Sequence, residues 1–133
     1  MDVNDISKAG DSTLLEVPMS IQYKHSPFMN KIKQGYDKLR GKQRSPSVNW
    51  LRPKGGNAQQ MIEVAQKSLA QGHSHIEFML HSSEFMPGGS PTFRTEQDID
   101  GLYNDLETLF NFLQDKVQGM TLAEYYHNKV QAK

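Results

Sequence analysis

Hydrophobic side chains recur every three or four positions in two early stretches of the chain, which is the spacing of an amphipathic helix. The first stretch follows Ser26-Pro27 and runs to about Arg40; serine is a common N-cap, and proline is favoured at the first helical position. The second follows Asn57, another common N-cap residue, and ends at Gly72, where glycine often terminates a helix. We therefore predict a helix in each stretch.

Two further helical patterns occupy the carboxy-terminal third of the chain. Thr95 with Asp98, and Thr121 with Glu124, have the spacing of a capping box, in which the two residues satisfy each other's backbone N–H groups at a helix start. A long stripe of leucine and aromatic residues follows the first pair up to Gly119, and a shorter stripe follows the second pair. The pattern predicts one long helix and one short final helix.

Three short apolar runs have the length of strands and cover residues 14–21, 48–53 and 75–81. The last two flank a predicted helix, and a strand joined to the next strand through a helix implies a parallel pair with a right-handed crossover. We therefore expect an α/β fold with about three parallel strands alternating with helices. Such a sheet has two open edges, so self-association through those edges is also expected.

Length and composition favour a single small domain. The 133 residues suit one domain, and residues 1–12, which are polar, are predicted to be a flexible lead-in. Basic and acidic residues balance at 15 each, so no global field favours a nucleic-acid partner. No apolar run is long enough to span a membrane, and there is no cysteine for a disulfide or a thiolate metal site. We expect a cytoplasmic protein.

The segment with most chemical content is residues 75–91, where an apolar run delivers His81 into a loop rich in glycine and proline. In α/β enzymes the reacting groups lie at the carboxyl ends of parallel strands, and imidazole can act as an acid or a base near neutral pH. His81 is therefore the candidate catalytic residue. The alternative is that its ring only hydrogen-bonds a loop carbonyl.

Polar residues follow His81 directly. Ser82 is a candidate substrate contact, and Glu84 could orient the histidine ring or share a metal with it. We favour a simpler interpretation for Glu84, that of an exposed acidic residue in a loop.

Residues 75–91 resemble the last motif of the polysaccharide deacetylase (NodB-homology) family: an apolar strand ending in Leu-His, then Ser-Ser-Glu, an apolar pair and Pro-Gly-Gly-Ser-Pro. The resemblance implies that His81 is the general acid that protonates the leaving amine. It also implies the last part of a distorted (β/α) barrel with a long carboxy-terminal helix pair.

Residues 49–53 loosely resemble a second motif of that family, an acid-Trp segment that lines the active site. Asn49 stands where an aspartate is usual, so no charge-relay role is expected of it. The resemblance implies that Trp50 forms a wall of a sugar pocket and that Arg52 contacts an oxyanion or a carboxylate. Packing in the core is the alternative role for Trp50.

A complete domain of the family uses Zn or another divalent metal, held by an aspartate and a His-x-x-x-His pair, and the metal activates water for attack. This sequence contains no such pair, so no metal site is predicted in the chain. The resemblance implies the carboxy-terminal part of a deacetylase-like domain, inactive alone, whose complete form removes N-acetyl groups from polysaccharide or lipopolysaccharide precursor sugars.

Two other functions stay open from the sequence. One is a noncatalytic carbohydrate-binding or assembly module. The other is a small hydrolase, which would require His81, Glu84 and Arg52 to come within hydrogen-bonding reach of one another.

Overall fold

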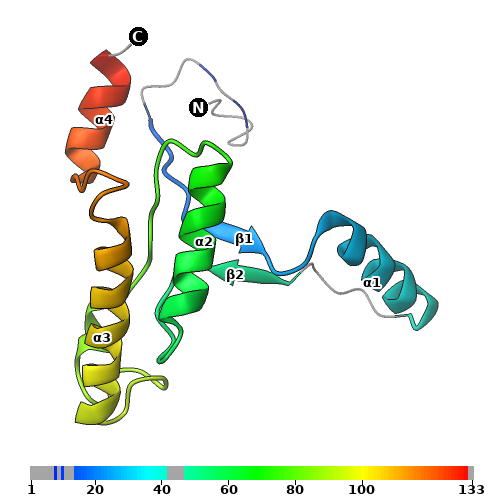
Figure 1. Cartoon of the computed structure of the whole chain (residues 1–133), viewed down its shortest axis with the longest axis horizontal. Coiled ribbons are helices and arrows are strands. Elements are labelled where there is room, and N and C mark those ends of the chain that lie inside the picture. Colours follow the sequence, from blue (N-terminus) through cyan, green and yellow to red (C-terminus); the bar gives the residue numbers. More distant parts are fainter. Residues whose placement is uncertain (1–7, 9, 11–13, 42–46, 132–133) are drawn as a thin grey trace. The chain divides into compact units, whose positions relative to one another are not determined.

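The computed structural model of the chain describes residues 8, 10, 14–41 and 47–131 (Figure 1). Its elements in chain order are strand β1 (Ile21–Tyr23), helix α1 (Pro27–Leu39), strand β2 (Val48–Trp50), helix α2 (Ala58–Ala70), the short 3₁₀ helix η1 (Ser82–Phe85), helix α3 (Glu96–Leu113) and helix α4 (Leu122–Gln131). All but residues 8 and 10 of the predicted lead-in over 1–12 lie outside the described residues.

The chain divides into two compact units. One comprises residues 19–111 and the other comprises residues 1–18 and 112–133. The candidate site residues all belong to the first unit. Within the described ranges, no helix combines the length and the apolar character that crossing a membrane requires.

The four predicted helices are confirmed, and their ends show why they form. Ser26 Oγ accepts a hydrogen bond from the Met29 amide at 3.4 Å, with proline at the first helical position of α1. Gly72, just after α2, has a φ of 73°, a conformation that side chains with a Cβ rarely adopt. Asn57 is the N-cap residue of α2, but its side chain makes no capping bond. Its oxygen accepts from the Lys54 amide instead, at 2.7 Å.

Both predicted capping boxes are present. The Asp98 carboxylate accepts from the Thr95 amide at 2.9 Å, and the Thr95 hydroxyl accepts from the Asp98 amide at 3.2 Å. Thr121 and Glu124 make the same exchange at the start of α4.

The long helix α3 ends at Leu113, well before Gly119, where the sequence placed its end. The Leu113 carbonyl accepts from the amides of both Lys116 and Val117, which closes a terminal turn. The Lys116 ammonium group also donates to the Phe112 carbonyl at 2.8 Å and so satisfies one of the last free carbonyls of the helix.

The predicted sheet of about three parallel strands is wrong. In the described residues the sheet has two strands, β1 and β2, and they run antiparallel with Gln22 opposite Asn49. The connection between the two antiparallel strands contains helix α1, and it is not the crossover that joins parallel strands. Residues 14–20, predicted as most of the first strand, have no regular structure, and the described residues show no part of a (β/α) barrel.

Residues 75–81 are extended but do not form a strand. Isolated hydrogen bonds join the segment to its described neighbours: the Ser20 amide donates to the Glu77 carbonyl at 3.0 Å, the Glu77 amide donates to the Ser20 hydroxyl at 3.0 Å, and Met79 donates to the Leu51 carbonyl at 3.4 Å. Two apolar side chains of the segment meet residues of α3 instead: the Phe78 ring lies 5.6 Å from the Phe110 ring, centre to centre, and Leu80 packs nearby. Leu80 contacts the buried cluster of Phe93, Ile99, Leu102 and Leu106. The hydrophobic run is thus accounted for by helix packing, which an apolar pattern alone does not distinguish from sheet pairing.

Helix α2 packs against both β1 and β2, and the three elements lie side by side in Figure 1. Its buried face carries Met61, Ile62, Val64, Ala65 and Ser68. The buried polar residue Gln22 of β1 donates to Ser68 at 3.2 Å and to Gln71 at 2.8 Å, so the strand pair and the helix share polar as well as apolar contacts. This layer fixes the end of β2, where the candidate site begins.

Candidate functional site

Arg52 is held at the end of β2 by its two neighbours. Leu51 and Pro53 are fully buried, whereas the Arg52 side chain keeps 27% of its surface exposed. In an extended segment successive side chains point to opposite faces, so burial of both neighbours directs the arginine away from that core. The Arg52 carbonyl accepts from the Asn57 side-chain amide at 3.0 Å, which ties this backbone to the start of α2.

His81 and Glu84 are joined by a compact turn. The Glu84 amide donates to the His81 carbonyl at 2.9 Å, and the Glu84 carboxylate accepts from the His81 amide at 2.9 Å. These reciprocal bonds close the start of η1, so the two side chains leave the same turn. The sequence interpretation of Glu84 as an exposed loop acid is wrong, because its side chain is only 4% exposed.

Arg52, His81 and Glu84 converge into one group, here named the His81 cluster. The Arg52 guanidinium donates to Glu84 Oε1 at 2.9 Å and lies 3.4 Å from His81 Nδ1. His81 Nδ1 lies 3.3 Å from Glu84 Oε2. The histidine side chain itself is 60% exposed, so the cluster presents an imidazole to solvent beside the buried Glu84 carboxylate.

Glu84 is ionised in this cluster. Burial by itself would raise the pKa of its carboxyl group. The hydrogen bond from the His81 amide, followed by the hydrogen bond and the charge of Arg52, outweighs burial and holds that pKa below the usual value. The carboxylate therefore stays charged near neutral pH and can hold both of its cationic or donor neighbours in place.

The contacts of His81 Nδ1 determine what the other ring nitrogen offers. A neutral ring that accepts from Arg52 at Nδ1 carries its proton on Nε2, and a protonated ring donates from Nδ1 to Glu84 and still carries a proton on Nε2. In both states the exposed nitrogen, Nε2, carries a proton, so the cluster presents an Nε2–H donor to solvent.

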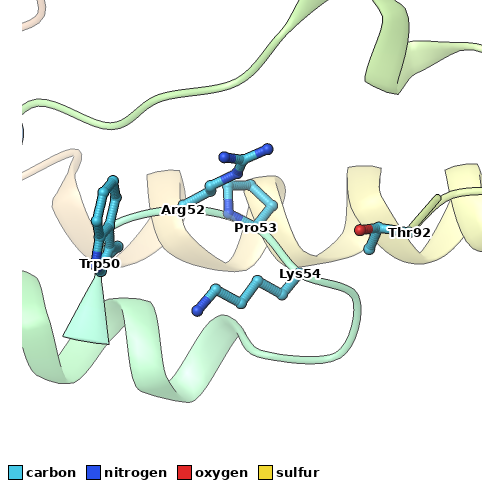
Figure 2. A pocket seen from close by; sticks show the side chains of 5 residues that line it. All are labelled: Trp50, Arg52, Pro53, Lys54 and Thr92. Atoms are coloured by element: carbon cyan, nitrogen blue, oxygen red, sulfur yellow. The ribbon is translucent and has the colours of Figure 1, made fainter. Parts of the chain in front are cut away.

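Trp50 and Arg52 line an open hollow of about 350 Å³ together with Pro53, Lys54 and Thr92 (Figure 2). Four of these five residues lie within the segment 50–54, and Thr92 comes from the loop before α3. The Trp50 side chain is on β2 and is 39% exposed, so packing in the core does not describe it. An aromatic face beside a guanidinium and a hydroxyl is a surface that can stack on a sugar ring and hydrogen-bond its substituents.

The loop of residues 86–93 backs the His81 cluster. The Gly88 amide donates to the Phe93 carbonyl at 2.9 Å, and the Gly89 amide donates to the Met86 carbonyl at 2.9 Å. Phe93 is fully buried and anchors the far end of the loop. A Cβ atom on Gly89 would overlap the Ser83 carbonyl oxygen, so the loop can pack this closely on η1 only with glycine there.

The residues near His81 do not suit a divalent metal. Both Glu84 oxygens already accept hydrogen bonds, one from Arg52 and one from the His81 amide, and the guanidinium would repel a second cation beside Nδ1. Within the described ranges, no group of three or more His, Cys, Asp or Glu side chains is placed to hold a metal ion. The described residues of this cluster therefore offer no ligand set for zinc or another divalent metal.

The structure brings together most of the residues that the sequence singled out. Arg52, His81 and Glu84 meet, and Trp50 shares the hollow with Arg52. Ser82 is exposed at the start of η1, and among the described residues no hydrogen bond joins its side chain to the cluster.

Sequence reasoning missed two walls of the hollow, Lys54 and Thr92. Lys54 lies just beyond the motif residues 49–53, so the motif gave no signal for it. Thr92 reaches the hollow through loop folding and carries no local signal.

No protein-family model, no curated protein and no solved structure matches this chain. The likeness to polysaccharide deacetylases therefore rests on the residues of its two motifs.

Proposed function

We propose that the chain is the carboxy-terminal part of a polysaccharide deacetylase-like domain, in which His81 supplies the acid for N-deacetylation of a surface polysaccharide or lipopolysaccharide precursor sugar. The observation that carries the proposal is the His81 cluster: an exposed imidazole beside an ion pair of the partly exposed Arg52 with the buried Glu84 at 2.9 Å. The support comes from this cluster and from the motif residues, since the predicted barrel is absent from the described residues.

His81 would act by donating its Nε2 proton to the amine nitrogen as the C–N bond breaks. Glu84 would keep the remaining ring proton on Nδ1, and Arg52 would hold Glu84 ionised. Arg52 and Glu84 are therefore positioning residues. Trp50 would contact the sugar, with its indole face in the hollow.

The described residues by themselves supply acid assistance but no means to activate water. General acid assistance contributes about 10²–10⁴-fold, whereas enzymes accelerate reactions by roughly 10⁶-fold or more. We therefore propose that these 133 residues alone do not turn over. A cytoplasmic location is part of the same proposal and is tested by cell fractionation.

Acetate release tests this function. The purified chain and its His81→Ala variant are incubated with N-acetylglucosamine oligomers and added Zn²⁺ or Co²⁺, and acetate is measured. We expect no release from either protein. Release by the parent chain that disappears in His81→Ala would contradict the proposal of an inactive part.

That second result would favour the small hydrolase, and a specific observation keeps it as the second candidate. The geometry that it requires is present, because Arg52, His81 and Glu84 lie within 3.4 Å of one another through their polar atoms. The assay separates the two candidates, since only the hydrolase releases acetate without further protein.

A further inference from the structure

Helix α1 carries an apolar face that the described part of the chain leaves exposed. Five large apolar side chains of the helix have between 43% and 89% of their surface exposed: Phe28, Met29, Ile32, Tyr36 and Leu39. Their spacing of three, four and seven positions places all five within one face of about 100° of the helix circumference. A contiguous exposed apolar face of this kind is typical of a docking surface.

Basic residues border this face on both sides. Lys33 and Arg40 fall on one edge, and Lys31 and Lys38 fall on the other, at about 100° of rotation per residue. All four side chains are exposed. The Arg40 guanidinium lies 4.6 Å from the centre of the Tyr36 ring, so this cation stays beside the apolar face. Gln34 lies on the opposite face.

The positive charge is concentrated around this helix. Residues 24–44 contain seven basic residues and one acidic residue, a formal charge of +6, although the whole chain is neutral. The remaining residues therefore carry −6. The neutral total, which argued against a global field, conceals a strongly basic stretch of sequence, and this local charge favours approach of the helix to a negatively charged surface.

We propose that α1 is an interfacial helix that docks the protein on an anionic lipid surface. Its apolar side chains would enter the boundary between headgroups and acyl chains, while the lysine and arginine residues on both edges reach the lipid phosphates. A flat, negatively charged surface with an apolar interior matches a face with cations on both of its edges.

Other partners fit these residues less well. A second copy of the chain would bring the lysine and arginine residues on the edges of two such helices together, and their repulsion opposes pairing through this face. Nucleic acid would use the positive charge but would leave five apolar side chains in water.

Vesicle sedimentation tests the proposal. The full chain is mixed with vesicles of equal parts phosphatidylcholine and phosphatidylglycerol, or of phosphatidylcholine alone. We expect binding to the anionic vesicles only, weakened when the salt is raised to about 0.5 M. The double variant Ile32→Gln with Leu39→Gln is expected to bind about tenfold more weakly. Gln34→Ser, on the opposite face, should bind like the parent chain.

Circular dichroism checks that the double variant keeps its fold, and light scattering measures its oligomeric state. We expect the fold to persist, because neither Ile32 nor Leu39 is buried. An equal helical signal from the parent chain and the double variant would show that weaker vesicle binding comes from the changed face and not from loss of the helix. Absence of binding to those vesicles, or equal binding by the double variant, would overturn the proposal. A lipid-free dimer that the double variant dissociates would also overturn it, in favour of a second copy. Neither result depends on sugar binding or acetate release.

Discussion

Glu84 is the residue on which the geometry of the His81 cluster depends. Its carboxylate receives the guanidinium of Arg52 on one oxygen and the backbone amide of His81 on the other. The side chain is almost wholly withdrawn from water, so its charge is tolerated only because those two donors compensate it. Removing the charge while keeping the shape therefore isolates the contribution of this group.

We expect Glu84→Gln to lower the free energy of unfolding by roughly 1–2 kcal/mol, because the partly exposed Arg52 loses its ion pair but regains water. Urea unfolding measures the change. Glu63→Gln, an exposed substitution on α2, is the matched control and should leave the midpoint unchanged.

The parent chain and Glu84→Gln are also expected to differ in how their unfolding free energy depends on pH. Since the folded state lowers the pKa of Glu84, the carboxylate contributes stability above its ordinary pKa of 4.5 and loses that contribution as the pH falls through the lower folded value. The difference in unfolding free energy between the parent chain and Glu84→Gln should be full near neutral pH and shrink below pH 4.5. A difference that grows on acidification would contradict the ionised Glu84.

At the scale of elements, the loop of residues 86–93 and η1 form a single backbone unit that presents His81. Gly89 sits where this loop meets η1, and a methyl group there would also approach the Met86 carbonyl oxygen to 3.1 Å. Both opposing atoms belong to backbone, so neither can move aside without opening the turn that places Glu84.

Gly89→Ala is therefore expected to destabilise the protein by roughly 1–3 kcal/mol and to weaken the Arg52–Glu84 pair. Gly101→Ala is the matched control: an added Cβ meets no atom within 4 Å there, and alanine favours the helix α3. Thermal unfolding of both variants gives the comparison. A Gly89→Ala protein as stable as the parent would show that the loop does not pack on η1 as described.

The helices could be predicted from the sequence because their signals are local. Ser26-Pro27, Thr95 with Asp98, and Thr121 with Glu124 act within one turn, and each is found at the start of its helix. The sheet could not be predicted in the same way. Whether residues 75–81 join a ladder or pack on α3 depends on Leu80 meeting the buried cluster that includes Ile99 and Leu102, and no pattern within the segment records that packing.

The candidate site could be predicted only where its residues are close in sequence. His81 and Glu84 share a turn, so their proximity follows from their spacing, but the burial of Glu84 depends on Arg52 arriving from the end of β2. Thr92 enters the hollow only because the loop before α3 folds back. Residue type and spacing identified the side chains that could take part in binding or catalysis. Contacts between distant parts of the sequence decided which of those side chains meet.

For the whole molecule, the site and the basic helix belong to one compact unit, residues 19–111, and use different surfaces. The His81 cluster and the hollow lie around the end of β2, whereas the apolar face of α1 is a separate helix face. Sugar recognition and lipid docking are therefore independent proposals, and the sugar proposal is the central one.

The most direct test of that proposal is a nuclear magnetic resonance titration of the full chain with an N-acetylglucosamine tetramer, using a glucose tetramer as control. Trp50 is the single tryptophan, so its indole signal reports on the hollow without ambiguity. We predict saturable shifts of the Trp50 indole and His81 ring signals with the N-acetylated sugar only. Absence of shifts, or shifts confined to residues away from the hollow and the His81 cluster, would contradict the account.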